Sequence, residues 1–178
     1  MDRSTLVLPP TTLAGWHALV AEAEYKETLQ LSEDLESYLV FLLIRFTENA
    51  AFSERVLALD FLNGLNASGQ HRQALLRDVG DACLLYAGFF PKRAINWRVS
   101  FRYVVDLGQT AYSTLSDAEY DQFSSVYAKL KVHFISLMDV LLAIREYTAP
   151  HLLPQEARAI WQATGSQVAY EVLHQYDR

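Results

Sequence analysis

The chain has 178 residues, 51% of them hydrophobic and 20% charged. A chain of this length can bury its own core, and the composition lacks the polar bias of a disordered protein, so we expect one domain over residues 1–178. The formal net charge of −6 makes nucleic-acid binding an unfavoured function, because a surface that neutralises phosphates carries a basic excess.

The chain is expected to be helical, because seven glycines and five prolines in 178 residues leave almost no hairpin signal. A first helix should follow the break at Pro9 and Pro10, and a second at about 33–48 should carry the longest apolar run, residues 38–44. This run is far shorter than the roughly 20 residues of a membrane span. We expect a third helix that ends in the cluster 63–69, a fourth at about 70–90 and a fifth at about 99–115. The β-branched and aromatic residues of 99–105 leave an extended opening as an alternative.

The clearest pattern lies at about 118–147, after a capping box at 116–119. Apolar residues recur there at alternating spacings of three and four, as the a and d positions of heptads do. They are Tyr120, Phe123, Tyr127, Leu130, Phe134, Leu137, Leu141 and Ile144. Pro154 suits the first position of a further helix, and Gly165 precedes a short last one. The prediction is an all-α fold, an irregular bundle of about seven helices around one long central helix.

No motif in the sequence indicates a catalytic residue, a metal ligand or a cofactor. The five histidines lack the Glu-x-x-His and i, i+4 patterns of helical metal sites, and His133 is expected to be half-buried and hydrogen-bonded. The single cysteine, Cys83, lies in an apolar stretch and should be a small buried hydrophobic residue. One cysteine requires no oxidising compartment, so a cytoplasmic location is expected. Enzymes need no named motif, and catalysis stays open.

Small residues share one face of each of the fourth and fifth helices, among them Gly80, Gly88 and Gly108. Glycine inside a helix is unfavourable relative to alanine, so these faces predict a close helix crossing. The alternative is a narrow ligand pocket around residues 80–112. The convergent polar groups of such a pocket would be Asp81, Arg98, Arg102, Tyr103 and Asp106.

The same segment resembles a pattern found in uncharacterised helical proteins of proteobacteria. The pattern consists of Gly80-Asp81, Leu85, Gly88-Phe89-Phe90, Arg98, Tyr103, Leu107-Gly108 and Ala111-Tyr112, and it covers about a third of the chain. The resemblance implies a bacterial origin and a shared structural centre around residues 80–112. It implies no activity.

Charge is unevenly distributed along the chain. Residues 92–102 contain four basic residues and no acid, interleaved with Trp97 and Phe101, whereas residues 22–36 contain six acids and one lysine. The basic segment could hold an anion or simply be solvated. A symmetric dimer that pairs the two segments would place Lys92, Arg93, Trp97 and Arg98 in its interface.

The function that these observations favour is a non-enzymatic helical interaction or scaffold protein that forms a homo-oligomer or binds another protein. The alternative is a small-molecule-binding protein, or an enzyme, that uses the pocket around residues 80–112. An interaction protein should expose apolar surface, whereas a binder should enclose a cavity with convergent polar groups.

Overall fold

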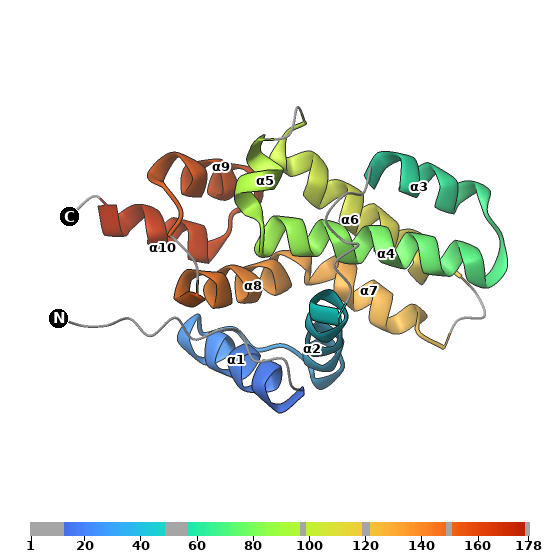
Figure 1. The fold of residues 1–178 in the computed structure, drawn as a ribbon, viewed down its shortest axis with the longest axis horizontal. Helices are drawn as coiled ribbons and strands as arrows, with labels where there is room; N and C mark the ends of the chain where they lie inside the picture. Colours follow the sequence, from blue (N-terminus) through green and yellow to red (C-terminus); the bar gives the residue numbers. More distant parts are fainter. Residues whose placement is uncertain (1–12, 49–56, 97–98, 119–121, 149–150, 177–178) are drawn as a thin grey trace.

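The computed structural model describes residues 13–48, 57–96, 99–118, 122–148 and 151–176. Within these ranges the regular structure is entirely helical, as predicted, and ten helices pack together (Figure 1). They are α1 (Leu13–Lys26), α2 (Glu33–Glu48), α3 (Leu57–Asn66), α4 (Gly69–Gly88), α5 (Pro91–Asn96), α6 (Phe101–Ser116), α7 (Ser124–Val132), α8 (Phe134–Thr148), α9 (Pro154–Thr164) and α10 (Gln167–Tyr176).

The first two helices form where the apolar spacing predicts them. Trp16, Val20 and Ala23 of α1 are buried and fall four and three residues apart, on one helical face. α2 has the predicted bounds, and its first turn contains Glu33, Asp34 and Glu36, whose charges favour the positive end of a helix.

Helix α4 lies in the middle of the molecule (Figure 1), and its second half is deeply buried. All ten residues of 79–88 are buried, so this half of the helix contacts protein on every side. Its neighbours include α3, α6 and α8. The core is therefore organised around α4, and the heptad-patterned segment packs against it through α8.

The heptad-patterned segment is divided into α7 and α8 at His133, so the prediction of one continuous helix is wrong. His133 has φ −99° and ψ 17°, outside the regular helical range, and its side chain is exposed rather than half-buried. The heptad face points inward from Tyr127 onward, because Tyr127, Leu130 and Phe134 are at most 6% exposed. Phe123, which was predicted to share this face, is 53% exposed. The spacing of apolar residues shows which residues face the core, but it does not show whether they belong to one helix or to two successive helices. Ser116, the predicted N-cap, is instead the last residue of α6, and α7 begins at Ser124, so the predicted helix start at about residue 118 is wrong. Glu119 and Tyr120 lie outside the described residues.

The fourth and fifth predicted helices, α4 and α6, cross closely. An ideal Cβ built on Gly108 of α6 would lie 2.8 Å from the Cβ of Cys83 in α4, and one on Gly80 would lie 2.6 Å from Cε1 of Tyr112. These glycines permit backbones to approach closer than side chains would allow. α6 begins at Phe101 after the N-cap Ser100, which accepts a hydrogen bond from the backbone N–H of Tyr103 (3.2 Å), so the extended alternative is wrong from residue 101 onward.

The C-terminal helices begin and end near the proline and glycine residues that predicted their boundaries. Pro154 is the first residue of α9, and Gly165 ends it in the left-handed conformation, with φ 71°. The Glu156 carboxylate accepts a hydrogen bond from the backbone N–H of Leu153 (2.8 Å), which completes the start of the helix. The short α5 was not predicted, since six residues make fewer than two helical turns. Among the described helices, none has the length and apolar character needed to cross a membrane.

Candidate functional site

Among the predicted site residues that the structure describes, only Asp81, on α4, is completely buried. Its Oδ1 accepts hydrogen bonds from the hydroxyl groups of Tyr38 (2.6 Å) and Tyr112 (2.7 Å), and its Oδ2 accepts one from Nη2 of Arg45 (3.1 Å). Tyr38 and Arg45 are seven residues apart on α2, so both project from the same face of that helix. We call these four residues the Asp81 cluster. It joins α2, α4 and α6.

Burial dominates the electrostatics of the Asp81 cluster. It raises the pKa of Asp81, and the Arg45 guanidinium and the two tyrosine hydroxyls oppose this rise. Burial and the nearby carboxylate also hold the pKa of Tyr38 and of Tyr112 well above the usual value, so both phenols remain donors. A buried carboxylate with three donors is a satisfied group. Its geometry explains cohesion between helices and provides no open position for a substrate.

The other predicted ligand-binding residues do not join this cluster. Arg102, Tyr103 and Asp106 are exposed on the first turns of α6. Arg102 forms an i, i+4 ion pair with Asp106 (Nε to Oδ1, 2.8 Å) and also donates to the carbonyl oxygen of Ala163 (3.0 Å). Arg98 lies outside the described residues. The structure thus brings Arg102 and Asp106 together, apart from the fully buried Asp81.

Side chains fill the positions at which the small residues would line a pocket. The atoms nearest to an ideal Cβ on Gly108 include the ring of Phe134 at 2.7 Å, and those nearest to one on Gly88 include Cβ of Leu141 at 2.5 Å. Both neighbours are fully buried core residues. These glycines therefore mark contacts between helices in the interior.

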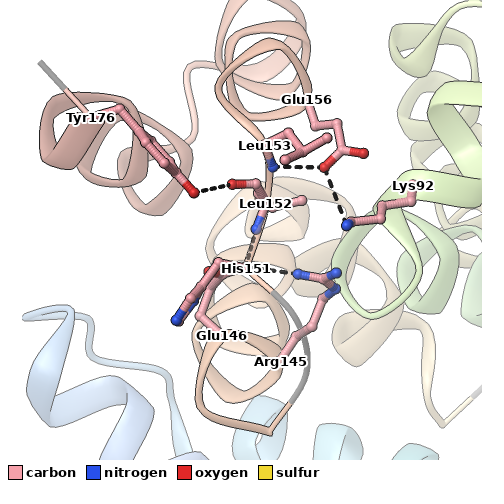
Figure 2. A network of polar contacts seen from close by, with 8 residues as sticks. All are labelled: Lys92, Arg145, Glu146, His151, Leu152, Leu153, Glu156 and Tyr176. Atoms are coloured by element: carbon pink, nitrogen blue, oxygen red, sulfur yellow. Dashed lines mark hydrogen bonds and ion pairs between the residues drawn. The ribbon is translucent and has the colours of Figure 1, made fainter.

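The predicted interface residues have neighbours within the chain. Lys92 forms an ion pair with Glu156 of α9 (3.6 Å), as Figure 2 shows. The exposed Arg93 lies over the ring of Phe90, 5.5 Å from its centroid. Trp97 and Arg98 lie outside the described residues.

Figure 2 also shows the contacts that join His151 and Leu152, which precede α9, to α8 and α10. The Glu146 carboxylate contacts Nη1 of Arg145 (2.7 Å), Nδ1 of His151 (2.9 Å) and the backbone N–H of Leu152 (3.3 Å). The hydroxyl of Tyr176 in α10 donates to the carbonyl oxygen of Leu152 (3.1 Å). These contacts link α8 and α10 through the residues that precede α9, so we assign them a structural role.

Three acids of the stretch at 22–36 contact basic residues that lie outside the segment 92–102. Glu22 pairs with Lys26 (3.0 Å) and Glu36 with His17 (2.9 Å). Asp34 pairs with Lys129 of α7 (2.5 Å), and this contact lowers the pKa of Asp34 to about 2. Within the described residues, these contacts link α1, α2 and α7.

A second buried carboxylate belongs to Asp139 of α8, at the start of α10. It accepts hydrogen bonds from the hydroxyl of Ser166 and from the backbone N–H of Gln167 (3.1 Å), and burial raises its pKa to about 6. Nearby, burial and the carboxyl of Glu171 in α10 raise the pKa of Glu27 to about 7. Each of these shifts disfavours the ionised form in the folded state.

The outer face of α3 is the feature that sequence reasoning missed. Leu59 and Leu62 are each 54% exposed and Leu65 is 38% exposed. The opposite face packs on α4, where an ideal Cβ on Gly64 would meet Leu76 at 2.8 Å, and Figure 1 shows α3 at the edge of the molecule. A short helix that is apolar on both sides is normally buried on both sides. Apolar residues on both faces are visible in the sequence of residues 57–65, and they could have predicted an exposed apolar surface on this helix.

In the part of the chain that the structure describes, no group of three or more His, Cys, Asp or Glu side chains is arranged to hold a metal ion. Cys83 is fully buried, as predicted, and burial raises the pKa of its thiol well above the usual value, which disfavours the nucleophilic thiolate. Comparisons with models of protein families, with curated proteins and with solved structures found no match.

Proposed function

We propose that this protein is a non-enzymatic helical interaction protein that self-associates through the outer face of α3. The observation that carries the proposal is the row of half-exposed leucines, Leu59, Leu62 and Leu65, on a helix that packs mainly on α4. Contiguous exposed apolar surface of this kind is typical of sites that bind another protein.

The charge of the molecule supports a second copy as the occupant. The formal net charge is −6, so two copies repel each other wherever charged surfaces meet. The exposed positions of α3 carry no charge at all, and they are Ala58, Leu59, Leu62, Asn63, Leu65 and Asn66. Two copies of this face can meet about a two-fold axis with the same residues on both sides. Lys92 and Arg93, on α5, are not part of the contact proposed here.

The size of the face implies weak association. A helix of ten residues is about 15 Å long, and it covers less than the roughly 800 Å² per partner of a stable interface. We therefore expect an equilibrium between monomer and dimer at micromolar concentrations and above, in which high salt strengthens association by screening the like net charges. A dimer held by opposite charges would respond in the opposite direction.

Sedimentation equilibrium over a concentration series tests the proposal. The mass should rise from 20.2 kDa toward twice that value. Leu62→Glu should hold the protein at the monomer mass, because it buries a charge in the contact. Leu13→Glu is the matched control, since Leu13 of α1 is also a leucine that is 54% exposed, and it should associate like the wild type. A monomer at every concentration and salt, or equal behaviour of the two variants, would contradict the proposal.

A further inference from the structure

An open groove runs between the first half of α4 and the start of α7. Its volume is about 570 Å³, within the usual range of small-molecule sites. The residues that line it include Gln70, Gln73, Arg77, Gln122, Phe123 and Tyr127. The α4 members fall at i, i+3 and i+7, so a single helical face presents two amides and one guanidinium.

The polar groups of this groove are available for a ligand. Within the described part of the chain, the side-chain amides of Gln70, Gln73 and Gln122 make no hydrogen bond. The Nε of Arg77 is buried without a hydrogen-bond partner among the described residues, and its Nη2 lies 3.9 Å from Asp78, a long ion pair. The Arg77 side chain as a whole is 41% exposed, so an anion in the groove can lie against its positive charge.

Aromatic rings complete the groove. Phe123 is 53% exposed and lines the groove, so a flat ligand there would lie beside an aromatic side chain. Tyr127 is 6% exposed and is held in place by stacking on Tyr112, with ring centroids 6.3 Å apart and an interplanar angle of 19°. Tyr112 is in turn fixed by its hydrogen bond to Asp81. The wall beside Tyr127 is therefore rigid, and it is supported from the interior.

These groups match one chemical class of ligand. A glutamine amide both donates and accepts, as the edge of a nucleobase does, and aromatic rings stack on bases of any kind. One guanidinium suits one phosphate, by paired hydrogen bonds. We infer that the groove between α4 and α7 binds a nucleoside monophosphate, with the base against Phe123 and the glutamines and the phosphate on Arg77. The acidic surface that disfavours a nucleic-acid polymer is no obstacle to a ligand with a single phosphate.

Isothermal titration of the full chain with AMP, GMP, CMP and UMP tests this inference. At least one should bind, and at least tenfold more tightly than its own nucleoside and than ribose 5-phosphate, which lack the phosphate and the base respectively. Failure of all four at millimolar concentration would overturn the inference. Equal binding of ribose 5-phosphate would also overturn it, because the rings and amides would then contribute nothing.

Variants separate the two halves of the recognition. Arg77→Met should lower the affinity for the nucleotide at least tenfold, to that of the nucleoside, and leave nucleoside binding unchanged. Arg158→Met removes one exposed charge from α9 and should change neither. Phe123→Ser should weaken both ligands alike, and its exposed position keeps the test valid if Arg77→Met fails to fold. Unchanged nucleotide affinity in Arg77→Met or in Phe123→Ser would refute the assignment. The result is independent of self-association through α3.

Discussion

Gly108→Ala would place a methyl group where α6 crosses α4 and α8. An ideal Cβ there would lie 2.7 Å from Cε2 of Phe134 and 2.8 Å from Cβ of Cys83, whereas contacting carbon atoms normally lie about 3.5–4.0 Å apart. Both neighbours are fully buried, so neither can retreat into solvent. Overpacking of this kind costs about 1–3 kcal/mol, against up to about 1 kcal/mol gained in helix propensity. We expect a net loss of about 1–2 kcal/mol in the free energy of unfolding.

Thermal melts followed by circular dichroism measure this loss. In a chain of this size 1 kcal/mol shifts Tm by about 2–4 °C, so Gly108→Ala should melt about 2–8 °C below the wild type. Gly108→Leu should not fold cooperatively. Gly64→Ala is the matched control, because its Cβ would meet Cδ2 of Leu76, the end of a flexible side chain, at 2.8 Å, and it should cost less. The close-crossing argument fails if Gly108→Ala melts at or above the wild type. It also fails if Gly64→Ala melts at a lower temperature than Gly108→Ala.

Three further changes test the core and the buried carboxylates. Leu130→Asp should abolish the cooperative melt, because it buries an unpaired charge on the heptad face at a cost of several kcal/mol; native helicity would show that this face is not core. Tyr112→Phe removes one of three hydrogen bonds to the Asp81 carboxylate and should cost about 1.5–3 kcal/mol in a denaturant titration, whereas an unchanged midpoint would show that the bond contributes nothing. The pKa of Glu27 is raised from 4.5 to about 7 in the folded state, so the wild type should lose stability as pH rises from about 4.5 through 7. Glu27→Gln should remove this part of the pH dependence, and Tm differences between the two proteins that stay constant from pH 5 to pH 8 would refute it.

The sequence predicted those features that depend on local chemistry. Pro154 and Gly165 bracket α9 as expected, because each has a fixed backbone preference, and the spacing of apolar residues identified the buried faces. The division at His133 could not be predicted in this way, since it depends on the backbone angles of one residue and leaves the apolar face unchanged. The partners of Asp81 could not be predicted either, because Tyr38 and Tyr112 lie 43 and 31 residues away in the chain. An acid within the apolar stretch at 79–88 does indicate that buried donors must exist somewhere.

The closed α4–α6 crossing leaves the surface on both flanks of α4 as the place where partners or ligands can bind. An ideal Cβ on Gly64 of α3 would meet Leu75 and Leu76 of α4, whereas Gln73 and Arg77 line the groove beside α7, so two different faces of α4 support the two proposed contacts. Because the faces differ, each proposal has a variant that should leave the other contact intact. Leu62→Glu should abolish self-association and still bind the nucleotide, and Arg77→Met should lose the nucleotide and still sediment as the wild type does. If either variant lost both self-association and nucleotide binding while keeping its native melt, the two faces of α4 would be coupled. A mononucleotide should then change the dimerisation constant by the same factor by which dimerisation changes the nucleotide affinity.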